Sequence, residues 1–574
     1  MKTIPGALER ARMIPLNTLG LPRPRAAAAF LVVALAACAS GAPPVTPAPQ
    51  PPVNRGAPPP PAAQSDRVPA AIVFEAPSNW HLLDAEIDRV AGIGAERALS
   101  ELLADREPSR TVVVAVIDGG VDTAHVDLDA NLWENPNDAA DGRDDDGNGY
   151  VDDVFGWNFI GGADGENVHY DTFEVTRLHA QCTGAQAAGA DEPTLAVPCD
   201  SIVRAFESKR GEAEQTLEQI RMVDMALGPA VPLLREVIGT DSLTVENVRS
   251  VRSSRADVQH AQQIYLQLAD NGITPEDVEE AKTAYESQIE YGYDLSFNPR
   301  PVVGDDYADL EQRTYGNLDV MGPDAGHGTH VAGIIAAVRG NSEGIDGIAP
   351  SVRIMAIRAV PDGDERDKDV ANAIRYAADN GADIINMSFG KAFSPHKGIV
   401  DEAVKYADER GVLMIHAAGN DGADLAVAPS YPNPVYADGG HAANWIEVGA
   451  SSWKGADSLA APFSNYGRDQ VDVFAPGVDI LSTEPDGAYG RNSGTSMAAP
   501  VVSGLAALIM AYYPDLSAAD VKRIILESST KLPDQRVVRP GSDNGELVPF
   551  GSLSRTGGIV NAYAALQMAD QLSR

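Results

Sequence analysis

Residues 300–574 alternate short apolar runs with longer stretches in which apolar side chains recur at helical spacing. The short runs predict β-strands, and the longer stretches predict amphipathic helices that bury one face. The predicted strands are 353–360, 382–388 and 412–417, and the predicted helices are 367–380, 399–410, 517–528 and 561–572. Such alternation predicts an α/β fold, a doubly wound parallel sheet with helices on both faces.

A different pattern fills residues 165–300, where apolar spacing predicts helices without intervening strands. The predicted helices are 212–227, 229–238, 245–252, 256–269 and 275–291. The last begins at Thr274-Pro-Glu-Asp277, which supplies a capping residue and a proline in the first turn. We therefore expect a mostly helical insertion in the α/β pattern. A lead-in at 65–110, with helical spacing over 84–104, precedes the α/β pattern.

Three polar residues, far apart in the chain, lie at the ends of predicted elements. Asp118 follows the apolar, β-branched run 112–117, which predicts a buried strand. His327 and Ser496 each open a stretch of small apolar residues that predicts a buried helix. A serine nucleophile needs a base that takes its proton, and the base needs a carboxylate that fixes its tautomer. The three side chains are therefore a candidate catalytic triad.

The motifs around these residues resemble those of the subtilases, the subtilisin-like serine peptidases. They read Asp118-Gly-Gly-Val-Asp122, His327-Gly-Thr-His330 and Gly494-Thr-Ser496-Met-Ala, in the order known for subtilisin. The resemblance implies a subtilisin-like domain over 111–574, interrupted by the insertion at 165–300. It also implies a serine endopeptidase acting on polypeptides, with Ser496 as nucleophile, His327 as general base and Asp118 as orienting carboxylate. A catalytically silent, substrate-binding protein with this fold remains the alternative.

The same resemblance assigns further residues to the site. Asn420, in Ala417-Ala-Gly-Asn420, matches the subtilase asparagine that donates a hydrogen bond to the oxyanion. The segment Ser388-Phe389-Gly390 matches the strand that pairs with the substrate backbone, and Ala417, Ala418 and Gly419 match another wall of the primary specificity pocket. Asp421 could lie at the mouth of this pocket. The acidic run Asp362-Gly-Asp364-Glu365 is either near a more distal subsite or a solvated loop.

Calcium is the predicted cofactor, with a structural role. Asp144, Asp146 and Asn148 supply oxygen ligands at positions 1, 3 and 5 of a loop with Gly149 at position 6, like the front of an EF-hand. The glutamate expected at position 12 is absent. The full set of predicted ligands is Asp144, Asp146, Asn148, Tyr150, Asp152 and Asp153, with an acidic turn as the alternative. Asp127 resembles the aspartate of a second subtilase calcium site.

Composition adds limits on partners and location. The formal net charge of −38 argues against nucleic acid and anionic membrane surfaces as partners. Arginines followed by the apolar run 26–37 predict a signal peptide over residues 1–37. Leu35-Ala-Ala-Cys38 resembles a bacterial lipobox, which implies lipidation of Cys38 and a bilayer anchor. Ala39 and Ser40 favour the outer membrane, and a plain signal peptide is the alternative.

Two further features set this chain apart. Residues 38–64 form a proline-rich segment that predicts an extended tether. Cys182 and Cys199 are an even pair in an exported chain and predict one disulfide, with two free thiols as the alternative. Asp118 and His327 lie 209 positions apart, far more than in compact subtilases. We expect substrate choice or control to depend on that long gap.

Overall fold

The computed structural model describes residues 76–188, 195–270 and 273–574. Contacts divide these residues into two compact units, Ser208–Glu290 and the remainder of the described chain. The predicted signal peptide, the tether and the lipidation site Cys38 lie outside the described residues.

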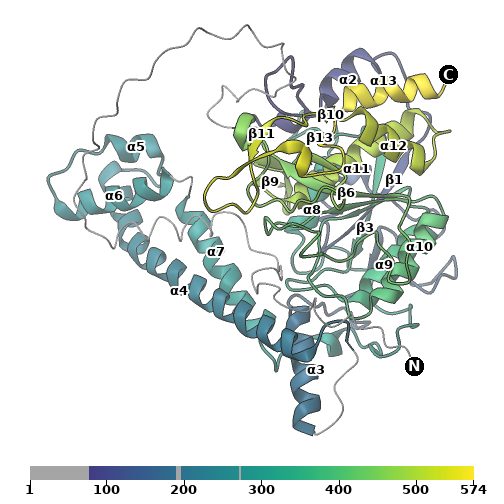
Figure 1. The fold of residues 1–574 in the computed structure, drawn as a ribbon, viewed down its shortest axis with the longest axis horizontal. Coiled ribbons are helices and arrows are strands. Elements are labelled where there is room, and N and C mark those ends of the chain that lie inside the picture. Colours follow the sequence, from purple (N-terminus) through teal and green to yellow (C-terminus); the bar gives the residue numbers. More distant parts are fainter. Residues whose placement is uncertain (1–75, 189–194, 271–272) are drawn as a thin grey trace, which may run out of the picture. The chain divides into compact units, whose positions relative to one another are not determined.

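A nine-stranded sheet forms the centre of the first unit (Figure 1). Its strands follow the order β10-β13-β7-β6-β5-β4-β1-β3-β2, and all neighbours are parallel except β10 and β13. The strands are β1 (Val112–Asp118), β2 (Gly156–Asn158), β3 (Val352–Arg358), β4 (Ile384–Met387), β5 (Leu413–Ala417), β6 (Trp445–Ser451), β7 (Val473–Pro476), β10 (Thr530–Lys531) and β13 (Gly558–Ile559). Two small antiparallel sheets pair β8 (Ile480–Glu484) with β9 (Ala488–Asn492) and β11 (Arg536–Val538) with β12 (Leu547–Pro549).

Helices cover both faces of this sheet, as Figure 1 shows. One face packs against α8 (Gly326–Ala336) and α11 (Thr495–Tyr512), with α12 (Ala518–Ser528), α13 (Ala562–Leu572) and α2 (Ala95–Glu101) in the same core; the other packs against α9 (Asp367–Asp379) and α10 (Lys397–Glu409). Along β1, Val114 and Val116 join the first core, whereas Ala115 and Ile117 join the second. Successive side chains of a strand point to opposite faces, so a continuously apolar strand needs cover on both. The predicted doubly wound α/β sheet is confirmed.

Helix α11 is the most deeply buried helix of this unit. It is long and apolar enough to span a membrane by length and composition, but it lies inside the protein. Every one of its 18 residues is buried except Ser496, the second residue of the helix. The apolar pattern that follows Ser496 therefore reflects a core helix, and the burial of that helix fixes the place of the serine.

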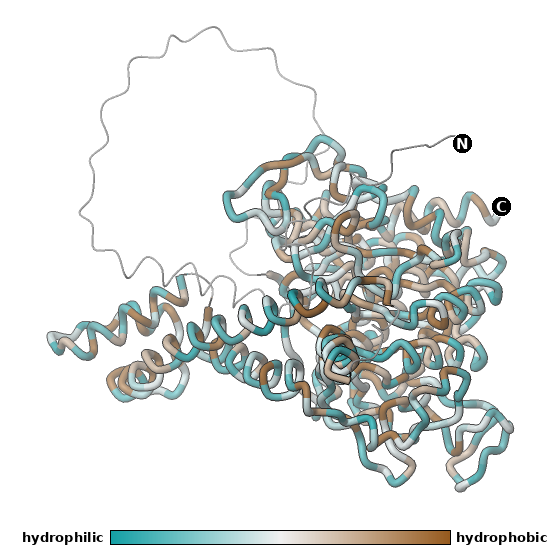
Figure 2. Tube along the Cα trace, turned by 60° about the horizontal axis from the view of Figure 1, so that its bottom comes forward, coloured by the Kyte–Doolittle hydropathy of each residue, from teal (hydrophilic) through white to brown (hydrophobic). Residues whose placement is uncertain are grey.

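The second unit is helical, as expected for the insertion. It holds most of α4 (Cys199–Ile238), together with α5 (Val245–Ser250), α6 (Ala256–Ala269) and α7 (Pro275–Ser287). Its helices carry hydrophobic and hydrophilic residues in alternation along their length (Figure 2). The capping box at Thr274 and Asp277 forms as the sequence predicts.

The predicted break before Pro229 is wrong, because α4 continues through Pro229 and Pro232. Gly228 precedes the first proline and has no Cβ, which relieves the clash that normally ends a helix before proline. Ala230, between the two prolines, and Leu234, after them, are buried against α5 and α6. That apolar burial offsets the backbone hydrogen bonds that two prolines remove.

The helix α3 (Glu174–Ala188) was absent from the sequence prediction. Polar Glu174, Thr176 and His179 are buried together with apolar Val175, Leu178 and Cys182, and these polar residues weaken the apolar pattern of the helix. A disulfide joins Cys182 of α3 to Cys199 at the start of α4.

The predicted lead-in helix over 84–104 is wrong in extent, because only α2 forms within it. A Cβ on Gly92 would lie 2.3 Å from the carbonyl oxygen of Trp80, and Gly94 has a φ of +73°. The chain therefore turns tightly at these two glycines and cannot continue one helix through them.

Candidate active site

The three candidate catalytic residues line one cavity of about 310 Å³. Asp118 ends β1, and Asn420 and Ser388 follow β5 and β4. Since these strands are parallel neighbours, their carboxyl ends meet at one edge of the sheet, where ligands of open α/β sheets bind. His327 and Ser496 reach the same cavity from the N-terminal turns of α8 and α11.

Asp118 and His327 form a close pair. The Nδ1 atom of His327 lies 2.8 Å from Oδ1 and 3.0 Å from Oδ2 of Asp118. The Asp118 side chain is 4% exposed, whereas that of His327 is 46% exposed. A buried carboxylate on Nδ1 favours the tautomer with the proton on Nδ1, in which Nε2 is the nitrogen that can accept a proton. His327 is therefore placed to act as a general base.

The approach of α8 to β1 depends on Gly328. A Cβ at this position would lie 2.1 Å from the carbonyl oxygen of Gly120 and 3.0 Å from Cβ of Asp118. The glycine after His327 therefore allows the contact that joins the histidine to its carboxylate.

Ser496 is held against the end of β4. Its hydroxyl donates to the carbonyl oxygen of Ser388 at 3.0 Å, and the Ser388 hydroxyl donates to the carbonyl oxygen of Ser496 at 2.9 Å. The amide of Asn386 donates to the Ser388 hydroxyl at 2.9 Å. The first turn of α11 also places the backbone N–H of Ser496 beside its hydroxyl, and a helix N-terminus is a favourable place for negative charge.

Asn420 is oriented by Thr495. Oδ1 of Asn420 accepts hydrogen bonds from the backbone N–H of Thr495 (2.8 Å) and from its hydroxyl (2.9 Å). With Oδ1 occupied, the Nδ2 group of Asn420 faces the backbone of Gly494. A Cβ atom added to Gly494 would lie 3.4 Å from this nitrogen. An amide donor beside the nucleophile can stabilise an oxyanion. The sequence reasoning missed Thr495, although the residue lies within a quoted motif.

All the residues predicted to form the walls of the specificity pocket line the cavity, with one exception. Ser388, Phe389, Gly390 and Gly419 line the cavity, but Ala418 does not. Ala418 is wholly buried in another core, and its carbonyl oxygen accepts a hydrogen bond from Asn465. Side chains alternate in direction along an extended segment, so Ala417 lines the cavity as predicted and Ala418 points away from it.

Arg358, the last residue of β3, was not predicted to lie in the site. It lines the cavity and donates from Nε to the carbonyl oxygen of Gly119 at 2.7 Å and from a guanidinium nitrogen to Oδ1 of Asn158 at 3.2 Å. Burial lowers the pKa of Arg358 to about 10, which still leaves it charged at neutral pH. The residue fixes the turn that follows Asp118.

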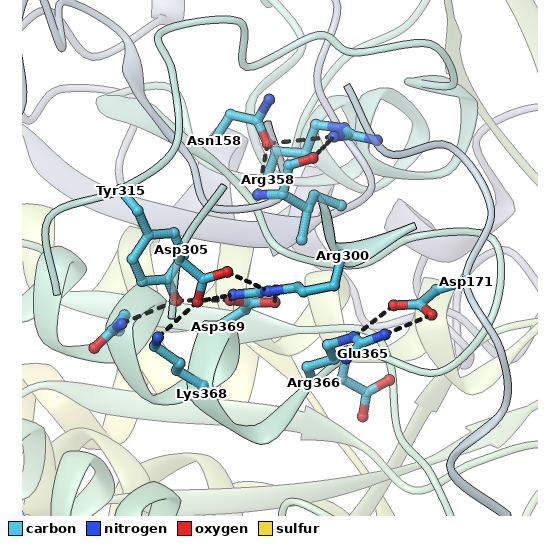
Figure 3. A network of polar contacts seen from close by, with 12 residues as sticks. Asn158, Asp171, Arg300, Asp305, Tyr315, Arg358, Glu365, Arg366, Lys368 and Asp369 are labelled. Carbon is cyan, nitrogen blue, oxygen red and sulfur yellow. Dashed lines mark hydrogen bonds and ion pairs between the residues drawn. The ribbon is translucent and has the colours of Figure 1, made fainter. Parts of the chain in front are cut away.

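A buried ion network joins the start of α9 to the segment that follows the insertion (Figure 3). Arg300 pairs with Asp305 at 2.6 Å and with Asp369 at 2.5 Å, and Lys368 pairs with Asp305 at 2.6 Å. The hydroxyl of Tyr315 donates to Asp369 at 2.6 Å. Charged side chains can remain ionised inside a protein when they are paired with opposite charges in this way.

The acidic loop gathers some of the predicted calcium ligands. The amide of Asn148 donates to Asp146 and to Asp153, both at 3.1 Å, and Asp153 is wholly buried. Burial raises the pKa of Asp153 to about 6. The carboxylate of Asp144 accepts backbone N–H groups of the loop itself.

Other predicted ligands point elsewhere. Asp152 accepts the backbone N–H groups of Asp141 and Gly142, and the hydroxyl of Tyr150 donates to the carbonyl oxygen of Arg313. No three acidic or imidazole side chains converge on a metal position in the described chain. An oxygen-rich loop is therefore present, but its carboxylates are partly satisfied by protein donors.

Asp127, the residue of the second predicted calcium site, is wholly buried. Its oxygens accept hydrogen bonds from the side chain of Asn341 (2.7 Å) and the backbone N–H of Ile345 (3.1 Å). The carboxylate thus ties the loop after α8 to the segment after β1 through protein donors.

Comparisons with known proteins agree with this geometry. The model of the Subtilase family, Peptidase_S8, matches residues 109–544. Subtilisin BL of Lederbergia lenta is 37% identical over 222 residues, which are 38% of this chain and 76% of that protein. Thermitase of Thermoactinomyces vulgaris is 38% identical over 237 residues, 40% of this chain and 78% of that protein. A thermophilic serine proteinase of Bacillus sp. (strain AK1) is 48% identical over 185 residues, 32% of this chain and 42% of that protein.

The contacts of Thr495 generate the first prediction. Thr495→Val removes the hydroxyl bonded to Asn420 and should lower kcat for a peptide about tenfold, the loss expected for one hydrogen bond. Asn420→Ala removes the donor itself and should lower kcat by about 10²–10³-fold. KM should change little in both variants.

Thr495→Ser is the matched control, because it keeps the hydroxyl and should keep most of the activity. Steady-state kinetics on one peptide measure all three variants. Equal kcat for Thr495→Val and the unmodified enzyme would show that the hydroxyl does not position Asn420 for catalysis.

Proposed function

The chain belongs to the subtilase family of serine endopeptidases, and we propose that Ser496, His327 and Asp118 carry out its peptide-bond hydrolysis. The bidentate contact between Asp118 and His327, in the cavity that Ser496 reaches from α11, is the observation that supports this assignment. A silent binding protein would not need a buried carboxylate on the imidazole.

The reaction has two halves. His327 Nε2 takes the proton of Ser496 as its oxygen attacks the peptide carbonyl carbon, and the charged imidazole is stabilised by Asp118. Asn420 Nδ2 and the N-terminus of α11 stabilise the oxyanion. His327 then gives the proton to the leaving amine, the C–N bond breaks, and an acyl-enzyme remains on Ser496. Water, deprotonated by His327, attacks the ester and releases the acid and the free serine.

Labelling with a fluorophosphonate probe tests the assignment, because the probe reacts with an activated serine. The unmodified enzyme should be labelled and should cleave a denatured protein substrate. Ser496→Ala should lose the label and at least about 10³-fold of the activity. Ser458→Ala removes an exposed serine of the same unit and should retain both. Labelling that persists in Ser496→Ala would overturn the assignment of the nucleophile.

We also propose that the loop 144–153 binds a structural calcium ion. The spacing of its oxygen ligands and the burial of Asp153 beside Asp146 and Asn148 support the proposal. A bound divalent cation would supply the positive charge that these carboxylates share. Asp153 is the acidic residue that we assign in place of the glutamate at position 12 of an EF-hand loop.

Removal of calcium tests this second proposal in the Ser496→Ala variant, which cannot digest itself. Calcium at 100 times its Kd should stabilise the fold by about 2.7 kcal/mol and raise Tm relative to chelator-treated protein. Asp146→Asn should abolish the rise in Tm, whereas Asp145→Asn, an exposed neighbour outside the predicted ligand set, should preserve it. The same Tm with calcium and with chelator would contradict the proposal.

Finally, we propose that the enzyme is exported and held at the outer membrane by lipid on Cys38. The signal-like residues 1–37, the lipobox resemblance and the proline-rich segment 38–64 support it. In a bacterial host, Cys38→Ser should move the fluorophosphonate-labelled protein from the membrane fraction to the soluble fraction. Ser40→Ala should leave it in the membrane fraction. A labelled Cys38→Ser protein that stays with the membrane would contradict the lipid anchor.

A further inference from the structure

The cavity that holds the triad has a second chemical feature, a buried carboxyl group that peptide hydrolysis does not use. Glu365 lines the cavity and is 2% exposed. It follows β3 and immediately precedes Arg366 and α9. Lys391, which directly follows Gly390 of the predicted substrate-binding segment, lines the same cavity.

Charged groups from three parts of the chain surround Glu365. The cations are Arg177 of α3, Arg366 before α9, and Lys391. Arg366 pairs with Asp171 at 2.7 Å, Arg177 with Glu174 at 2.8 Å, and Lys391 with both Glu174 and Asp367 at 2.9 Å. Three cations therefore meet three carboxylates, and these six charges are balanced without Glu365.

Two carboxyl groups, those of Asp364 and Glu365, take no part in these ion pairs. Asp364 accepts the backbone N–H of Glu174 at 2.8 Å, so it already has a role in holding α3. Glu365 differs, because Oε1 is buried and has no hydrogen-bond partner among the described residues. The hydrogen bond that Lys391 donates to Glu365 goes to the backbone carbonyl oxygen, at 2.7 Å.

Figure 3 shows the same arrangement around Arg366. The guanidinium of Arg366 meets Asp171, while the carboxyl of Glu365 points away from that pair. A buried carboxylate oxygen without a hydrogen-bond partner, such as Oε1 of Glu365, is unfavourable, and a cation that binds it removes the penalty.

We propose that Glu365 is a specificity-determining residue that binds a cationic side chain of the peptide substrate, an arginine guanidinium or a lysine ammonium. The proposal rests on the endopeptidase function and names the class of peptide it selects. Lys391, which follows the Ser388–Gly390 segment, donates to the backbone of Glu365, so we expect the bound residue to lie away from the scissile bond. The segment 171–177, near the start of the insertion, supplies Asp171 and Glu174, which pair with the surrounding cations. Glu365 is then not needed to neutralise those cations and can bind a cation of the substrate.

The protonation of Glu365 gives this binding a pH dependence. Burial and the neighbouring Asp364 raise the pKa of Glu365 to about 8, against the opposing effect of Lys391. The other charged groups around it are Asp367, Glu174, Arg177, and Arg366 with its partner Asp171. Glu365 is mainly protonated in the free enzyme below about pH 8, and a cation binds the carboxylate form. Preference for a cationic peptide should therefore increase as pH rises through about 8.

Paired peptides containing arginine or citrulline test the proposal, since citrulline has the shape of arginine without its charge. The pair is compared at each position on the acyl side of the scissile bond. The residue whose carbonyl is cleaved is not the one that Glu365 should bind. At one of the acyl-side positions before it, the unmodified enzyme should prefer arginine to citrulline by about tenfold to hundredfold in kcat/KM. Glu365→Gln should reduce this preference to less than about threefold and leave kcat/KM for the citrulline peptide within about twofold.

Asp421→Asn is the matched control, because it removes another carboxyl group that lines the cavity. The Asp421→Asn variant should keep the preference for arginine at the substrate position that Glu365 binds. Retention of the preference in Glu365→Gln, or its loss in Asp421→Asn, would overturn the proposal.

A second measurement needs no variant at Glu365. In the unmodified enzyme, the ratio of kcat/KM for the arginine peptide to that for the citrulline peptide should rise between pH 7 and 9. Titration of His327 affects both peptides equally and cancels in this ratio. A ratio that stays constant would overturn the proposal. Fluorophosphonate labelling in the same samples separates this outcome from failure of the endopeptidase assignment, in which labelling itself is absent.

Discussion

The active site depends on the burial of α11 against the parallel sheet. Seventeen of the 18 residues of this helix are buried, and the exception is Ser496 at its N-terminal turn. Removing this much apolar surface from water is the largest favourable contribution a helix makes to folding. The burial of the helix therefore fixes the position of Ser496, the proposed nucleophile. The backbone N–H of Ser496, which lies at the same helix end, is favourably placed for negative charge.

The rest of the site is assembled by short polar contacts along the sheet edge. Ser388 and Ser496 exchange hydrogen bonds between β4 and α11, and Thr495 holds Asn420 of the neighbouring segment. Each contact joins parts of the chain separated by more than 70 residues. Since each pair is held by its own donors and acceptors, the geometry of nucleophile, base and oxyanion donor is set before substrate arrives.

Sequence reasoning predicted what depends on local patterns. Apolar runs gave β1, β3, β4 and β5 to within about two residues, and the motifs gave Asp118, His327 and Ser496, which line one cavity. It failed where tertiary contacts outweigh local preference. Burial beyond Pro229 keeps α4 continuous, and polar residues on the buried face of α3 hid that helix. The direction of Ala418 depends on the backbone after β5, which a motif does not specify.

The long gap between Asp118 and His327 changes the chemistry of the cavity as well as the length of the chain. Its segment 171–177 places Glu174 and Arg177 against Lys391, next to the segment that follows β4. Desolvated charges require partners. The carboxylates of this segment form ion pairs with Lys391 and with the neighbouring cations, and these ion pairs hold Lys391 in place. Glu365 is then left as a buried carboxyl group in the cavity wall. An insertion can thus alter substrate choice through charge balance at its first residues, without its helical unit contacting the substrate.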